Sequence, residues 1–147
     1  MSELEAFYQR YIDAVNAHDS EAFAACYHPP VTLLAAPRPN ERGVGLRPRA
    51  LPDMAYALGT FPDHWARSSI DSLVELADAA PLVRGLTGEA AGADPGLRQG
   101  IIATCTRWDT SGKPYERVQA LYLCTRQDGE LGFKVIAELA TFPIDDT

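Results

Sequence analysis

The sequence is poor in the residues that build metal, redox and disulfide sites. Its three cysteines, Cys26, Cys105 and Cys124, show no Cys-x-x-Cys spacing, which argues against a zinc ribbon and against a disulfide framework. Its three histidines form neither a His-x-His nor a His-Glu-x-x-His motif. We therefore predict no bound metal and no cofactor, and we interpret the cysteines as small core residues.

Basic residues and long apolar runs are also scarce. The chain has 13 Lys and Arg against 20 Asp and Glu, a net charge of -7, which would repel a phosphate backbone unless the bases gathered on one face. No apolar run reaches the ~18 to 20 residues that span a bilayer. The acidic start, residues 1–5, does not resemble a secretory signal. We expect no nucleic-acid partner, no membrane span and a cytoplasmic location.

The N-terminal segment predicts two helices. Ser2 with Glu5 forms a capping-box pattern, and the helix that follows should end near Asn16. Asp19 can cap a second helix over Ser20 to Tyr27, which the prolines at positions 29 and 30 would end. Apolar residues recur at helical spacing along the first helix, at Leu4, Phe7, Tyr8, Tyr11, Ile12 and Val15.

The rest of the chain predicts strands with one short helix between them. Alternating and apolar runs indicate that the strands come after the helices, which is the α+β order within a single domain of residues 1–147. Asp128-Gly129 between two apolar runs predicts a hairpin. The expected strands are Val31–Ala35, Ser69–Ala77, Gly100–Asp109, Tyr115–Arg126 and Leu131–Phe142, and the short helix is Pro52–Leu58. Residues 82–87 fit either a strand or a loop.

The segment Gln9–Asp19, with the second helix and the strand after it, resembles the opening of the NTF2-like superfamily, and the strand, Asp-Gly turn and strand near the end resemble its C-terminal hairpin. That superfamily includes ketosteroid isomerases, SnoaL-like polyketide cyclases and limonene-epoxide hydrolases. The resemblance implies an NTF2-like (cystatin-like) cone, in which N-terminal helices pack on a curved antiparallel sheet and enclose an apolar pocket for a small hydrophobic or polycyclic molecule. It also implies a homodimer made through the sheet.

The resemblance to the ketosteroid isomerases implies a role for one catalytic position, whereas the other catalytic positions of that family hold apolar residues here. Tyr11 stands at the position of the tyrosine that donates a hydrogen bond to the developing enolate in that family. Without gaps, the family's base falls at Ala35 and its partner acid at or beside Leu121, and the acid of the cyclases falls near Ala140.

Tyr11 and Glu138 are the candidate catalytic residues. Tyr11 lies on the apolar stripe of the first helix, so its ring is a pocket-lining donor or a structural part of the core. Glu138 interrupts the apolar run of residues 135–140. Its carboxylate lies either on a solvated or dimer-facing side of the strand or, desolvated, in the pocket.

The candidate substrate-binding residues are His28, Asp71, Arg107, Trp108 and Tyr122. Arg107 and Trp108 are neighbours in a strand, so only one of them can line the pocket. Arg107 paired with Glu138 or Asp71 would resemble the epoxide hydrolases, and the alternative is an ordinary cross-strand ion pair. Asp71 also fits a solvated strand face, and His28 also fits a cap at the end of the second helix.

Three function hypotheses follow. The leading one is a cofactor-independent lyase, isomerase or cyclase, with Tyr11 as oxyanion donor and Glu138 as the proton-transfer group. The second is a non-catalytic module for ligand binding or dimerisation, motivated by the empty positions at Ala35 and Leu121. The third is an epoxide hydrolase that uses Arg107 and a carboxylate.

Overall fold

The computed structural model describes residues 2–35, 47–51, 61–76, 78 and 99–144. Within these residues, two helices precede six strands, as in the α+β order that the sequence predicts. Their bounds are α1 Glu3–Asn16, α2 Ser20–Ala24, β1 Tyr27–Ala35, β2 Arg47–Leu51, β3 Trp65–Leu76, β4 Gln99–Asp109, β5 Pro114–Gln127 and β6 Glu130–Pro143. The predicted helix at 52–58 and the undecided segment at 82–87 lie outside the described residues.

Both helices begin where their capping residues predict. The Ser2 side chain accepts a hydrogen bond from the Glu5 amide at 3.1 Å, and the Asp19 carboxylate accepts one from the Ala22 amide at 3.0 Å. Helix α1 is confirmed. Helix α2 is shorter than predicted and ends at Ala24.

The predicted end of α2 at Tyr27 is wrong because Tyr27 already belongs to strand β1, where it pairs with Phe133 of β6. The prolines that were expected to end the helix lie inside this strand. Pro29 and its neighbour fall where the β1–β6 register is interrupted, between Tyr27 and Thr32. Proline is tolerated in a strand at such an irregularity because no ladder hydrogen bond is required of it there.

The six strands form one sheet in the order β2-β1-β6-β5-β4-β3. All neighbours are antiparallel except β1 and β6, which run parallel. The sheet is therefore mixed, which corrects the prediction of an antiparallel one. Alternation within a strand identifies its faces but carries no information on the direction of its partner, so the parallel pair could not be read from the sequence.

The three long C-terminal strands are confirmed to within one residue at each end. The turn between β5 and β6 has positive φ at both central residues, 54° at Asp128 and 82° at Gly129. This is the signature of the type I′ hairpin that the Asp-Gly pair predicts. Strand β3 begins at Trp65, four residues before the predicted start.

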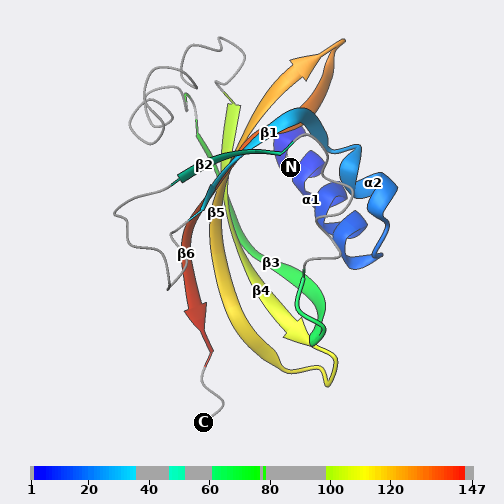
Figure 1. Ribbon diagram of the computed structural model, residues 1–147, viewed down its shortest axis with the longest axis vertical. Helices are drawn as coiled ribbons and strands as arrows, with labels where there is room; N and C mark the ends of the chain where they lie inside the picture. Colours follow the sequence, from blue (N-terminus) through cyan, green and yellow to red (C-terminus); the bar gives the residue numbers. More distant parts are fainter. Residues whose placement is uncertain (1, 36–46, 52–60, 77, 79–98, 145–147) are drawn as a thin grey trace.

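The sheet curves around the helices, which lie on its concave side (Figure 1). The aromatic core fills the space between α1 and this inner face, and it includes Tyr8, Tyr11, Tyr27 and Phe133. The three cysteines are buried and unpaired, as predicted for core residues. No described helix is long and apolar enough to cross a membrane.

Candidate functional site

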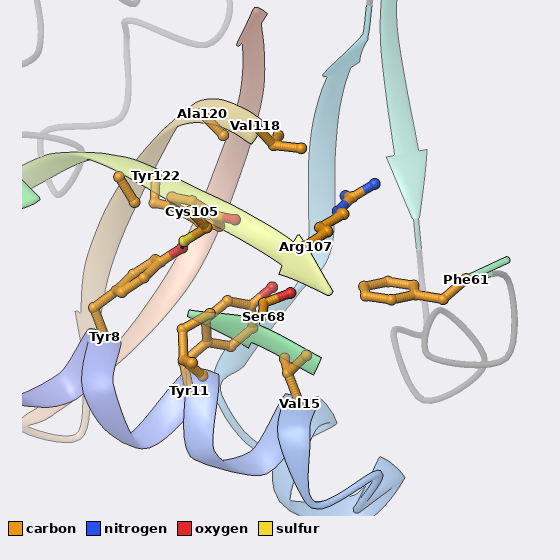
Figure 2. Close-up of a pocket in the computed structure, with 12 residues that line it drawn as sticks. Tyr8, Tyr11, Val15, Phe61, Ser68, Cys105, Arg107, Val118, Ala120 and Tyr122 are labelled. Carbon is orange, nitrogen blue, oxygen red and sulfur yellow. Dashed lines mark hydrogen bonds between the residues drawn. The ribbon is translucent and has the colours of Figure 1, made fainter. Parts of the chain in front are cut away.

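A small cavity lies between helix α1 and the inner face of the sheet (Figure 2). Its volume is about 50 Å³, enough for a small chemical group, whereas pockets for drug-sized ligands start at ~300 Å³. Side chains of α1 point from below towards β4, which crosses above them in Figure 2. The described lining residues are Tyr8, Tyr11, Ile12, Val15, Phe61, Ser68, Ala103, Cys105, Arg107, Val118, Ala120 and Tyr122.

Two tyrosine hydroxyls form a buried pair at this cavity. Tyr27 lies behind the lining and donates a hydrogen bond to the hydroxyl oxygen of Tyr11 at 2.9 Å. Because the Tyr11 oxygen accepts this bond, its own O–H can donate, and in the structure its hydrogen-bond partner is the Tyr122 side chain, which a ligand oxygen would have to replace. Rings of Phe23 and Phe133 pack against Tyr11 and hold it in place. The result is a hydroxyl donor fixed in an apolar surrounding.

Burial keeps these hydroxyls neutral. It raises the pKa of Tyr8, Tyr11 and Tyr27 well above the ordinary value of a tyrosine. Burial also raises the pKa of Tyr122, against an opposite effect of the Tyr8 and Tyr11 hydroxyls beside it. At neutral pH all four side chains therefore carry their proton and can act as hydrogen-bond donors, not as bases.

Cys105 and Ser68 complete the polar lining. The Cys105 sulfur lies 3.6 Å from the Tyr8 hydroxyl, and burial raises the pKa of this thiol, so it stays protonated. Ser68 accepts a hydrogen bond from the Trp65 indole at 3.1 Å. The backbone of Ser68 is held at both N–H and C=O by the side-chain amide of Asn16, each at 2.8 Å, which ties the end of α1 to β3.

Arg107 brings the one formal charge into the described lining. Its Nη1 donates a hydrogen bond to the Glu116 carboxylate at 2.7 Å, and the two side chains are 30% and 25% exposed. The guanidinium also lies over the Phe61 ring, 5.5 Å from its centre. Arg107 and Phe61 lie at the end of the cavity away from Tyr8 and Tyr122 (Figure 2). The cavity thus has a neutral hydroxyl-rich end and a charged end.

Of the predicted site residues, Tyr11, Tyr122 and Arg107 come together in the cavity. Glu138 does not join them, because its side chain is exposed. It pairs across the sheet with Ala120, which lines the cavity, but from Glu138 onward β6 has no buried residue. Of the two placements that the sequence leaves open for Glu138, the structure shows the exposed one, so its predicted place in the pocket is not observed.

Asp71 and Trp108 lie outside the cavity lining as well. The Asp71 carboxylate accepts a hydrogen bond from Thr106 at 2.6 Å and lies 3.4 Å from the Arg117 guanidinium. The Trp108 indole donates to Ser69 at 2.9 Å. Neither side chain pairs with Arg107, whose partner is Glu116, directly opposite on the next strand. The alternative of an ordinary cross-strand ion pair is thus the one observed.

His28 also lies away from the cavity. Its Nδ1 is 2.9 Å from the Thr125 hydroxyl, and Lys134 donates a hydrogen bond to its backbone carbonyl at 3.2 Å. Burial, with the nearby Lys134 charge, lowers the pKa of this imidazole. Because α2 ends at Ala24, the interpretation of His28 as a helix cap is wrong.

Two residues at the site, Tyr27 and Glu116, are not among those that the sequence predicts. Tyr27 was assigned to the second helix, so its pairing with Tyr11 across the start of β1 could not be seen. Glu116 could have been found from the hairpin that joins β4 to β5, since the register of that hairpin sets it opposite Arg107. Within the described lining no side chain is a carboxylate or an imidazole. Glu116 is the carboxylate that contacts the lining, through Arg107.

No group of three or more His, Cys, Asp or Glu among the described residues is placed to hold a metal ion. What the arrangement can do chemically is donate hydrogen bonds to an oxygen atom. The Tyr11 hydroxyl supplies a neutral donor and Arg107 supplies a charged one, both beside apolar walls.

Comparison with known proteins gives neighbours in structure only. No family model matches the sequence, and no curated protein sequence matches it. A protein of unknown function with a cystatin-like fold from Nostoc punctiforme PCC 73102 aligns with a TM-score of 0.60 and 9% identity, over 92% of this chain and 86% of that one. An NTF2-like protein of unknown function from Shewanella baltica OS155 aligns with a TM-score of 0.53 and 10% identity, over 98% and 99%.

A third neighbour is ActVI-ORFA from Streptomyces coelicolor, with a TM-score of 0.57 and 13% identity, over 93% of each chain. At such identities the similarity concerns the fold. These alignments and the helix-on-curved-sheet architecture confirm the predicted NTF2-like, cystatin-like fold.

Proposed function

We propose that this NTF2-like fold serves as a cofactor-independent enzyme of the lyase, isomerase or cyclase class, which moves a proton next to a carbonyl group of a small hydrophobic substrate. The hydrogen-bonded pair of Tyr27 and Tyr11 carries the proposal. A buried hydroxyl fixed in an apolar cavity can donate to an oxygen atom as negative charge develops on it, and such preorganised donors are among the largest contributions to catalysis.

In the proposed reaction a base removes a proton from the carbon beside the carbonyl, and the electron pair moves onto the oxygen to form an enolate. Tyr11 donates its hydrogen bond to that oxygen. The proton-transfer role predicted for Glu138 is instead proposed for Glu116, because Glu116 contacts Arg107 of the cavity lining while Glu138 is exposed. Return of the proton to the same or another carbon completes an exchange or an isomerisation.

The cavity volume of about 50 Å³ favours a small substrate, or a small part of one, over a polycyclic ring system. A proton-transfer test needs no knowledge of the natural substrate. Cyclopentanone in D₂O loses its α-protons to solvent when an enolate forms, and NMR follows the loss. We expect wild type to accelerate this exchange, and Tyr11→Phe to slow it by ~10² to 10³-fold, the range for loss of one oxyanion donor.

Tyr115→Phe is the matched control, because Tyr115 is a tyrosine outside the described cavity lining and its loss should leave the exchange rate unchanged. Equal rates for wild type and Tyr11→Phe would contradict the enzyme proposal.

The second candidate function is a non-catalytic binding module, favoured by the lack of a carboxylate within the described lining. In that case cyclopentanone would bind without any exchange above the buffer rate.

We also propose a homodimer formed through the outer face of the sheet. Val74 and Phe142, on β3 and β6, are 54% and 53% exposed, and Leu139 is 40% exposed. Large apolar side chains at this level of exposure are reason to expect a partner surface. Sedimentation at micromolar concentration should give a species of twice the chain mass, and a single monomeric species would contradict the proposal.

A further inference from the structure

The polar groups around the cavity indicate what kind of molecule it would accept. Within the described lining there is no negative charge, and the one formal charge is the guanidinium of Arg107. The tyrosine hydroxyls and the Cys105 thiol are protonated because burial raises their pKa. A ligand that supplies only acceptors, above all an anion, therefore fits this lining better than a ligand that supplies donors.

The setting of Arg107 is that of a binding group. In the described part of the chain its guanidinium donates one hydrogen bond, to a single oxygen of Glu116. A guanidinium has five N–H donors in a planar fork, which matches a carboxylate in two-point contact. The Phe61 ring at 5.5 Å holds one side of the group. Because both side chains are partly buried, water screens their attraction less than at an exposed surface. A substrate carboxylate that replaced Glu116 would therefore keep a strong attraction to Arg107.

From these observations we propose that the substrate is a short oxo acid, whose carboxylate binds Arg107 while its carbonyl oxygen accepts the hydrogen bond from Tyr11. This inference rests on the proposed function, since it uses the same cavity and the same oxyanion donor. The bound carboxylate competes with Glu116 for the guanidinium. A bound carboxylate thereby weakens this ion pair and makes Glu116 a better proton acceptor than it is with a neutral ketone such as cyclopentanone.

The cavity size agrees with this substrate class. About 50 Å³ admits a chain of a few heavy atoms, so a carboxylate and a carbonyl a few carbon atoms apart would occupy the two ends. Arg107 and Phe61 mark one end and Tyr8 and Tyr122 the other (Figure 2). A neutral ketone of the same length would use only the hydroxyl end.

The test compares 4-oxopentanoate with its neutral amide, 4-oxopentanamide, which has the same chain and the same ketone. Calorimetric or NMR titration should show that wild type binds the carboxylate at least about tenfold more tightly than the amide. Arg107→Gln should remove this preference and leave amide binding in place. Glu116→Gln removes the competing charge, so it should strengthen carboxylate binding by about two- to fivefold and slow α-proton exchange.

Arg117→Gln is the matched control, because Arg117 is an arginine in a carboxylate pair with Asp71, outside the described cavity lining. It should leave the preference unchanged. Equal binding of carboxylate and amide, an Arg107→Gln variant that keeps the preference, or no binding of either compound would overturn the inference. If Arg107→Gln does not fold, the Glu116→Gln titration decides, and unchanged or weaker carboxylate binding overturns it.

Failure of this inference can be told apart from failure of the proposed function. Tyr11-dependent proton exchange that is equally fast in both compounds would keep the enzyme and remove the oxo-acid specificity. A strong Arg107-dependent preference without any exchange would keep carboxylate recognition and remove the enzyme.

Discussion

Among the described residues, each face of the sheet carries an arginine–carboxylate pair, and the two pairs differ in their surroundings. On the inner face Arg107 and Glu116 are 2.7 Å apart, beside the cavity, with side chains 30% and 25% exposed. On the outer face Arg117 of β5 and Asp71 of β3 are 3.4 Å apart and 53% and 36% exposed. The residue types are nearly the same, so the difference in burial decides which arginine is suited to bind a ligand.

Aromatic residues show the same contrast. On the inner face Phe133 is fully buried, and its ring lies about 5 Å from the rings of Phe7, Tyr11 and Tyr122. On the outer face Phe142 of the same strand is half exposed. The aromatic cluster of the inner face also carries the tyrosine hydroxyls, so the stability of the site and of the fold should be coupled.

The largest effect should come from alkaline pH. The four buried tyrosines of the inner face have their pKa raised in the folded state, so above pH ~10 the unfolded chain binds fewer protons than the folded one. The free energy of unfolding should fall by about 1.4 kcal/mol per pH unit for each such tyrosine. The chain has six tyrosines, so the part of the absorbance change at 295 nm that corresponds to these four should coincide with the loss of circular dichroism. Ionisation of more than two tyrosines well before unfolding would contradict this.

The next effect is the loss of one aromatic ring. Phe133→Ala should lower the free energy of unfolding by about 3 to 5 kcal/mol, because it leaves a cavity at the centre of the aromatic core. Phe142→Ala on the outer face is the matched control and should cost less than about 1 kcal/mol. Urea denaturation of both variants measures the difference. Similar losses for the two variants would show that the outer face is covered more than its exposure indicates.

The inner face was the more predictable of the two. The helical spacing of Tyr8 and Tyr11 was enough to place them on the buried side of α1, and the Asp128-Gly129 turn fixed the pairing of β5 with β6. Local pattern determined these features. The capping residues Ser2 and Asp19 were likewise readable, since each acts on an amide three residues away.

The predictions that the structure corrects concern residues whose surroundings are set by distant parts of the chain. Tyr27, predicted to lie in the second helix, pairs in β1 with Phe133, more than a hundred residues away. The side chain of Glu138 is exposed although Ala120, directly opposite on β5, lines the cavity. Alternation along one strand contains no information about where its burial ends. Arg107 is different: its carboxylate partner lies only nine residues away, and the register of the β4–β5 hairpin sets Glu116 opposite it.

A smaller effect is expected from Gly132→Ala, which tests whether substitutions away from the cavity can also destabilise the fold. A Cβ added to Gly132 would lie 2.5 Å from the His28 ring, so Gly132→Ala should displace that ring and break its hydrogen bond with Thr125. We expect a loss of about 1 to 3 kcal/mol in the free energy of unfolding. The double variant with His28→Ala removes the clash, so Gly132→Ala should cost much less in that background. Equal costs in both backgrounds would refute the steric explanation.

The smallest effect on stability should come from the loss of the outer ion pair between Arg117 and Asp71. Arg117→Gln breaks a long, well-exposed contact with Asp71, so the free energy of unfolding should change by less than about 0.5 kcal/mol. Arg107→Gln leaves Glu116 half-buried beside a hydrophobic ring and without its partner, so its cost should be larger, about 1 kcal/mol or more. Parallel urea titrations at low and at 1 M salt measure both. Salt should shrink the Arg117 effect towards zero but leave most of the Arg107 effect, because screening acts mainly on exposed charges. If the two variants lost equal stability at both salt concentrations, the burial difference on which the choice of Arg107 depends would carry no energetic weight.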